Sequence, residues 1–118
     1  MCSSDLITQI SRDPVIRQSY TNDPLVHNRA TTSMALHTLN AISWAFDHAH
    51  EFPAPLLLMH GSQDQIAFPA GSQEFARRVP GDCTMKVWDG RYHEIHNDPG
   101  KEEVFAYLLR WLEQHCPI

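Results

Sequence analysis

The chain has 118 residues, of which 42% are hydrophobic and 19% are charged, as is typical of an ordinary globular protein. Nine basic and fourteen acidic residues give a formal net charge of −5, which argues against nucleic acid as a partner. No apolar run approaches the roughly 20 residues that a membrane-spanning helix needs. The three cysteines (Cys2, Cys83 and Cys116) are widely scattered and favour free thiols in a reducing compartment, so we expect a cytoplasmic protein.

The first half of the sequence predicts helices. Residues 1–6 have neither the basic start nor the apolar core of a signal peptide, and we expect them to be a non-native or disordered terminus. Asp13 followed by Pro14 favours the start of a short helix. Thr31 or Thr32 is a suitable N-cap for a longer helix that reaches about His50. The apolar residues of this helix recur every three or four positions and predict a packed face, formed by Ala35, Leu39, Ile42, Phe46 and Ala49.

A change from helix to sheet is predicted at residues 52–55, where two prolines favour extended backbone. Residues 56–59 follow as an unbroken apolar run, which is typical of a parallel strand buried on both faces. Gly61 and Ser62 end this strand, and Asp64 comes directly after them. An aspartate at such a place is either a turn former or helix cap, or a residue that takes part in chemistry.

The second half repeats the order of strand, turn and polar residue. Residues 69–78 predict a helix long enough to connect two parallel strands, and residues 84–88 predict the second strand. Asp89-Gly90 ends that strand, and His93 lies just beyond it. We expect Asp98 to cap a last helix. The apolar side of that helix should pack on the sheet through Val104, Phe105, Leu108, Trp111 and Leu112.

Asp64 and His93 are the candidate catalytic residues, because the carboxyl ends of neighbouring parallel strands meet at one edge of a sheet. A carboxylate that binds one imidazole nitrogen fixes the tautomer and leaves the other nitrogen free as a general base. The alternative is a metal site that combines His93 and His96 with Asp64 or Glu94. The spacing of three residues falls on an irregular loop without further ligands nearby, which does not favour it. His60 is expected to be a packed or pocket-edge residue.

These motifs resemble a known family. Gly61–Asp64 after one apolar strand, followed by Tyr92–Asp98 after the next, resembles the C-terminal half of an α/β-hydrolase. The most similar group is the branch of monoacylglycerol lipases and lysophospholipases of the serine aminopeptidase type. The segment Asn22–His27 is similar to the lid region of that branch, so the resemblance extends over nearly the whole chain.

The resemblance implies an α/β fold with a specific division of the chain. Residues 52–118 would be the last two parallel strands of an α/β-hydrolase core with their flanking helices. Residues 7–51 would belong to a helical lid, which implies peripheral contact with a membrane. Asp64 and His93 match the acid and the histidine of a triad whose chain order is Ser, Asp, His.

One departure from the family concerns the nucleophile. None of the eight serines has a glycine two residues before it and another two residues after it, so the sequence contains no Gly-x-Ser-x-Gly. We therefore predict a C-terminal fragment of a serine ester hydrolase that supplies Asp64 and His93 and is inactive alone. The substrates implied by the resemblance are monoacylglycerols, lysophospholipids or similar esters, and no cofactor is implied.

Two other interpretations remain open. Epoxide hydrolases and haloalkane dehalogenases share the architecture but use an aspartate nucleophile, and only the other half of the fold would distinguish them. The chain could instead be a non-catalytic binding or assembly piece. Two strands with open apolar edges favour self-association or completion of the sheet by another chain.

Overall fold

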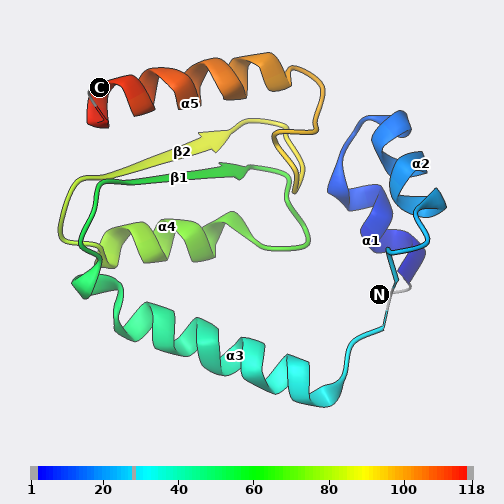
Figure 1. Cartoon of the computed structure of the whole chain (residues 1–118), viewed down its shortest axis with the longest axis horizontal. Coiled ribbons are helices and arrows are strands. Elements are labelled where there is room, and N and C mark those ends of the chain that lie inside the picture. The colour runs from blue at the N-terminus through cyan, green and yellow to red at the C-terminus, as the bar shows by residue number, and fades with distance from the viewer. Residues whose placement is uncertain (1–2, 28, 117–118) are drawn as a thin grey trace.

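The computed structural model describes residues 3–27 and 29–116. The elements in chain order are α1 (Ser3–Ile10), α2 (Pro14–Asn22), α3 (Thr32–Asp47), the short 3₁₀ helix η1 (Ala49–Glu51), β1 (Leu56–Gly61), α4 (Pro69–Arg78), β2 (Cys83–Trp88) and α5 (Lys101–His115). Figure 1 shows α5 on one side of the two strands and α4 on the other, with α3 beyond α4. The pair α1 and α2 lies near the carboxyl ends of the strands.

The two strands form a parallel pair, as the sequence predicts. Leu56 lies opposite Cys83 at one end of the register, and Gly61 lies opposite Trp88 at the other. The main-chain bonding continues past the strands, since the Ser62 N–H donates to the Trp88 carbonyl at 2.8 Å. Because α4 returns the chain to the start of β2, both strands end at the same edge. The loops that carry Asp64 and His93 therefore leave the sheet side by side.

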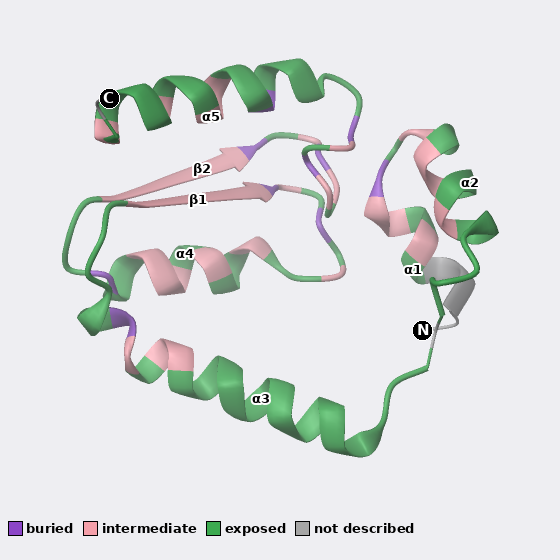
Figure 2. Cartoon of the chain, in the orientation of Figure 1, coloured by how far each residue is buried: buried purple, intermediate pink, exposed green. Residues whose placement is uncertain are grey.

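Burial of the strands is less complete than predicted. All residues of β1 before Gly61 are half-buried (Figure 2), whereas the sequence predicts a strand buried on both faces. The physical reason is that the described sheet has two strands, so each strand has one unpaired edge. The buried cluster lies beneath α5 and consists of Trp88, Ile95 and Val104, with Met59 and Tyr107 packed against it.

Helix α3 starts as predicted, but most of its apolar face is uncovered. The Thr31 hydroxyl accepts the Met34 N–H at 3.1 Å, which confirms the N-cap. Leu39 is 64% exposed, and only the C-terminal end packs, where the rings of Phe46 and Phe75 meet edge to face at 5.7 Å. The predicted packed face is therefore wrong for most of the helix, since no described element lies against it (Figure 2).

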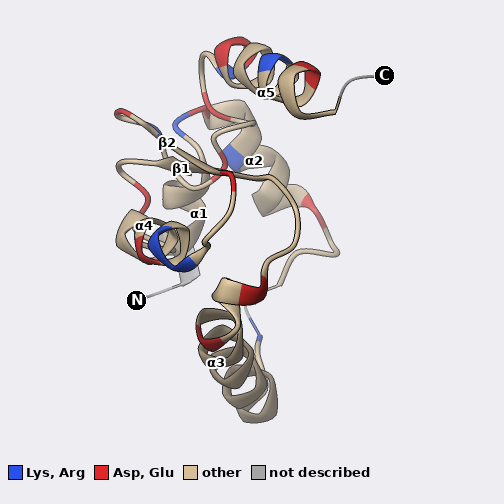
Figure 3. Ribbon diagram, turned by 90° about the vertical axis from the view of Figure 1, so that its left-hand side faces the viewer, with Lys and Arg blue, Asp and Glu red and all other residues tan. Residues whose placement is uncertain are grey.

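The same helix is almost without charge. Its single charged residue is Asp47 at the last position, so nearly the whole of α3 is uncharged in Figure 3. Across residues 3–27 and 29–116, no helix combines the length and the apolar character needed to cross a bilayer. Helix α3 is thus a nearly uncharged helix whose large apolar side chains are mostly exposed.

The N-terminal segment is more ordered than expected. We expected residues 1–6 to be disordered or non-native, but residues 3–6 begin α1; residues 1–2 lie outside the described residues. Order is favoured because α1 packs beside α2 and its last carbonyls accept hydrogen bonds from the loop after β2. Asp13 caps α2 as predicted, accepting the Val15 N–H at 2.8 Å. Whether the first residues are native stays a prediction.

Candidate active site

Gly61 brings the two loops into contact at the end of the sheet. A Cβ atom on Gly61 would lie 2.2 Å from the Tyr92 carbonyl oxygen and 2.4 Å from the Arg91 carbonyl oxygen. Only a residue without a side chain leaves room for backbone at this distance. The Gln63 N–H then donates to the Arg91 carbonyl at 2.9 Å. The segment that leads to His93 is thereby fixed against the end of β1.

Asp64 and His93 meet, as the sequence predicts. The Nδ1 atom of His93 lies 2.8 Å from Oδ2 of Asp64 and hydrogen bonds to it. The Asp64 side chain is 1% exposed, whereas the His93 side chain is 38% exposed. Nε2 of His93 has no hydrogen-bond partner among the described residues. Because an ionised carboxylate only accepts, Nδ1 carries the proton and Nε2 is left as an accessible base.

The second oxygen of Asp64 also acts as a turn former. Oδ1 accepts the N–H groups of Ile66 and Ala67 at 2.8 and 3.0 Å. Burial alone would raise the pKa of Asp64, but the hydrogen bonds from Ala67, His93 and Ile66 outweigh it and hold the pKa below its usual value. The carboxylate is therefore ionised near neutral pH, which suits a group that orients a histidine.

Asp98 has a different role from the predicted one. Helix α5 begins at Lys101 after Gly100, whose φ of 84° gives it a left-handed backbone, and no side chain caps the helix. The Asp98 side chain is fully buried and accepts the backbone N–H and the Nε–H of Arg12 at 2.7 and 2.8 Å. It also accepts the Ser11 hydroxyl at 3.3 Å and the Tyr92 N–H at 3.4 Å. The carboxylate is thus used to bind the N-terminal segment to the loop that holds His93.

The other polar residues of the site do not assemble a metal centre. Across the described ranges, no group of three or more His, Cys, Asp or Glu side chains is arranged to hold an ion, so the metal alternative gains no support. Glu94 is engaged by the Tyr20 hydroxyl and by Asn97, and its hydrogen bond to the hydroxyl raises the pKa of Tyr20 to about 12. His96 is exposed. His60 instead lies with its Nε2 2.8 Å from Oδ2 of Asp64, a contact that the sequence analysis missed because its spacing matches no motif.

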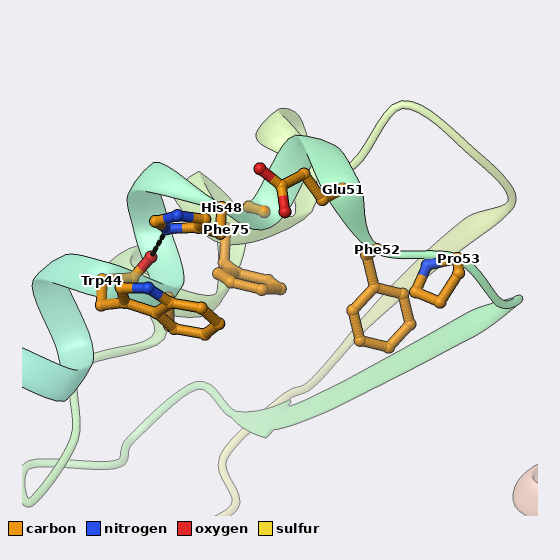
Figure 4. A pocket seen from close by; sticks show the side chains of 8 residues that line it. Trp44, His48, Glu51, Phe52, Pro53 and Phe75 are labelled. Atoms are coloured by element: carbon orange, nitrogen blue, oxygen red, sulfur yellow. Dashed lines mark hydrogen bonds between the residues drawn. The ribbon is translucent and has the colours of Figure 1, made fainter.

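A largely apolar cavity of about 560 Å³ lies beside His93. It is lined by Leu57, Leu58, Met59, His93, Ile95, His96, Val104, Phe105 and Leu108. A second cavity of about 340 Å³ lies near the amino end of β1, where Trp44, His48 and Phe75 are among its lining residues (Figure 4). There the His48 ring hydrogen bonds to the Trp44 carbonyl at 2.8 Å and has no carboxylate partner among the residues that the structure describes. Of these two cavities, the first combines an apolar wall with a histidine oriented by a carboxylate.

Comparison with known proteins decides the family. The family model for serine aminopeptidase S33 matches residues 2–100 of the chain. The chain belongs to this family. It is 41% identical over 91% of its length to an abhydrolase domain-containing protein of Dictyostelium discoideum, and 32% identical over 90% to a monoacylglycerol lipase of Mycolicibacterium smegmatis. The crystal structure of the Paleococcus ferrophilus monoacylglycerol lipase covers 92% of the chain with a TM-score of 0.87 and 32% identity.

These matches confirm the α/β-hydrolase fold and the monoacylglycerol lipase branch that the sequence motifs indicate. The chain spans only part of each relative: 12% of the Dictyostelium discoideum protein, 39% of the Mycolicibacterium smegmatis lipase and 43% of the Paleococcus ferrophilus lipase. It therefore corresponds to a part of a monoacylglycerol lipase-type hydrolase. The catalytic roles of Asp64 and His93 stay predictions, which the geometry of the site supports.

Proposed function

We propose that the chain supplies the acid and the histidine of a Ser-Asp-His triad in an ester hydrolase. The observation that carries this proposal is the 2.8 Å hydrogen bond between Nδ1 of His93 and Oδ2 of Asp64. It leaves Nε2 without a partner among the described residues, on a side chain that is 38% exposed and lines an apolar cavity. An oriented base next to an apolar wall suits an enzyme in which the base activates a nucleophile and the wall binds the chain of a lipid ester.

In this mechanism each residue has one task. A serine outside this sequence attacks the ester carbonyl, and Nε2 of His93 accepts its proton and later gives it to the leaving alcohol. Asp64 holds the imidazole and stabilises its charged form, while backbone N–H groups near the nucleophile bind the oxyanion. Water then releases the acyl group. Since the sequence contains no Gly-x-Ser-x-Gly, the 118-residue chain alone is expected to be inactive.

The proposed substrates are monoacylglycerols, lysophospholipids or similar single-chain esters. Support comes from the Mycolicibacterium smegmatis and Paleococcus ferrophilus relatives, both of which are named monoacylglycerol lipases. The same matches favour the lipase branch over the epoxide hydrolases and haloalkane dehalogenases. The apolar lining beside His93 supports the choice of a lipid chain over a polar acyl group.

The test is a chimera in which this chain replaces the matching 43% of the Paleococcus ferrophilus lipase. We expect it to hydrolyse a monoacylglycerol. His93→Ala and Asp64→Asn should each lower kcat by a factor on the order of 10⁴ or more, since triad members act as a unit. His50→Ala, an exposed histidine of η1 that lines neither cavity, is the matched control and should stay within about 2-fold. A chimera that melts cooperatively but hydrolyses neither a monoacylglycerol nor a lysophospholipid would refute the proposal.

A second candidate, a non-catalytic assembly piece, is favoured by the open sheet. The described sheet has two strands with one unpaired edge each, and Leu36 and Leu39 of α3 are 58% and 64% exposed. Such surfaces favour self-association or completion by another chain. Sedimentation of the 118-residue chain tests this candidate, which predicts a concentration-dependent increase in mass. A monomer with a single cooperative melting transition would count against it.

We also propose peripheral contact between the lid segment and membranes in the cytoplasm. The exposed apolar residues of α3, which include Trp44 at 63% exposure, and the near absence of charge on the helix support this contact. Flotation of the chimera with neutral phosphatidylcholine vesicles should show binding. Replacing Leu36 and Leu39 by aspartate should reduce it about tenfold or more, and unchanged flotation of that variant would refute the contact.

A further inference from the structure

The ring of His60 lies among three polar groups, one of which is the acid of the proposed triad. Its Nε2 lies 2.8 Å from Oδ2 of Asp64 and hydrogen bonds to the Ala67 carbonyl at 2.7 Å. Its Nδ1 lies 2.8 Å from the Ser72 hydroxyl of α4. The His60 side chain is only 13% exposed. A histidine held by three partners from the following loop and helix has a fixed ring orientation.

The partners determine which nitrogen carries hydrogen. A carbonyl and an ionised carboxylate can only accept, and both lie within 2.8 Å of Nε2. A bare nitrogen lone pair would repel both oxygens at this distance, so Nε2 is protonated, donates to the Ala67 carbonyl and lies beside Oδ2 of Asp64. The Ser72 hydroxyl can donate to Nδ1 or accept from it, so it suits this tautomer. Thus His60 presents a positive edge to Asp64.

The arrangement leaves the Asp64 carboxylate with contacts on all sides. Oδ1 receives the N–H groups of Ile66 and Ala67, while Oδ2 receives Nδ1–H of His93 and faces Nε2–H of His60. A carboxylate has about four lone-pair sites, so three donated hydrogen bonds and the close Nε2 of His60 surround it. Without His60, Oδ2 would be held by His93 alone. The two backbone N–H groups would still hold Oδ1, so the loss of His60 would affect the position of Oδ2, the oxygen that His93 uses.

We propose that His60 is a positioning residue that fixes the Asp64 carboxylate so that Oδ2 is aligned with Nδ1 of His93. This role rests on the proposed triad and places a second side chain, besides His93, against Oδ2 of Asp64. His60 does not touch the substrate and acts through Asp64. Ser72 and the Ala67 carbonyl hold the ring of His60, and so the helix after β1 contributes to the alignment of the base.

The experiment compares His60→Phe with His60→Gln in the chimera described above. Phenylalanine keeps an aromatic ring but has no donor, whereas glutamine keeps an N–H donor near the place of Nε2. We expect His60→Phe to lower kcat by about 10-fold to 100-fold with KM within about 2-fold, because a small misplacement of the base is costly. His60→Gln should restore most of kcat. His50→Phe, an exposed histidine of η1, is the matched control and should leave kcat unchanged.

A second measurement does not depend on turnover. Imidazole ¹⁵N–¹H spectra of the chimera report the Nδ1–H signal of His93, which is shifted downfield by its bond to Asp64. We expect this signal to move or broaden in His60→Phe and to return in His60→Gln. Unchanged kcat and spectra in His60→Phe would overturn the proposal. Equal losses in both variants would also overturn it, since shape rather than donation would then be the cause.

The two readouts separate the two proposals. A folded chimera that lacks hydrolysis refutes the proposed function, while the His93 signal in His60→Phe still decides the positioning role. Conversely, an active chimera with an unchanged His93 signal supports the triad and refutes the role of His60.

Discussion

Replacing Asp98 should destabilise the fold more than any other exchange of one carboxylate. Its fully buried side chain accepts four hydrogen bonds, two of them from Arg12 and one each from Ser11 and Tyr92. In Asp98→Ala the N–H groups of Arg12 and Tyr92 lose their acceptor, at about 1–3 kcal/mol for each donor left unsatisfied. Breaking a buried ionic pair costs about 3–5 kcal/mol in total. We expect Asp98→Ala to lower the free energy of unfolding by about 3–4 kcal/mol, below the top of this range, because the Arg12 side chain is 40% exposed and can be rehydrated.

The opposite exchange should have a smaller effect. Arg12→Ala removes the guanidinium but leaves Asp98 with three donors, namely the backbone N–H at position 12, the Ser11 hydroxyl and the Tyr92 N–H. Because the arginine of the lost ion pair is partly exposed, Arg12→Ala should lower the free energy of unfolding by about 1 kcal/mol. The asymmetry between the two exchanges is the specific result of a buried carboxylate with several donors.

Urea unfolding followed by far-ultraviolet circular dichroism measures both variants. With an m-value of about 2 kcal/mol/M, Asp98→Ala should lower the midpoint by about 1.5–2 M and Arg12→Ala by about 0.5 M. Asp89→Ala, an exposed carboxylate on the turn after β2, is the control and should change the free energy by less than about 0.5 kcal/mol. Equal losses for Asp98→Ala and Arg12→Ala, or a loss below about 1 kcal/mol for Asp98→Ala, would refute the reasoning.

Three further exchanges test other parts of the structure. Gly61→Ala should unfold the chain or lower its stability by more than about 3 kcal/mol, because the new Cβ would lie 2.2 Å from the Tyr92 carbonyl oxygen. Gly71→Ala should raise the stability by up to about 1 kcal/mol, because this helical glycine has open space around it. Thermal melts of the two variants test both expectations. The lowered pKa of Asp64 adds stability that is complete above the unfolded value of about 3.9 and is lost as the pH falls through the lower folded value. Urea titrations below pH 5 should therefore show a steeper loss for the unmodified chain than for Asp64→Asn, and parallel curves would contradict this. Leu39→Asp on the uncovered face of α3 should change the unfolding free energy by less than about 0.5 kcal/mol and reduce self-association in sedimentation; a large loss of stability would show that the face is packed.

Local signals in the sequence predicted the elements well. Pro69 and the nine residues after it form α4 with the predicted bounds, and Thr31 caps α3 as expected. Helix starts and strand ends are specified by residues within a few positions, so one sequence suffices to find them. The meeting of Asp64 and His93 was also predictable, because parallel strands joined by one helix must end at the same edge.

Contacts between distant segments were not predictable in this way. Asp98 followed by a proline has the pattern of a helix cap, yet its carboxylate binds Arg12, which lies 86 residues earlier. The tertiary contact is favoured over a helix cap because four donors bind the two oxygens of the buried carboxylate. The face of α3 failed for the opposite reason: its apolar period is clear, but no described element covers Leu39. Periodicity reports which side can pack and says nothing of whether a partner is present.

The position of the N-terminal helices changes how the proposed lid and core are related. The predicted boundary at residues 51 and 52 separates them along the chain, but in space the end of α1 lies against the histidine loop. The Gln9 and Ile10 carbonyls accept the N–H groups of His93 and Glu94 at 3.4 and 2.8 Å. Asp64 therefore fixes the His93 ring, while α1 fixes its backbone. Since both segments hold the base, a displacement of the proposed lid at α1 would move the backbone of His93. If the base is to stay aligned, the part of the lid that opens must therefore follow α1 in the chain.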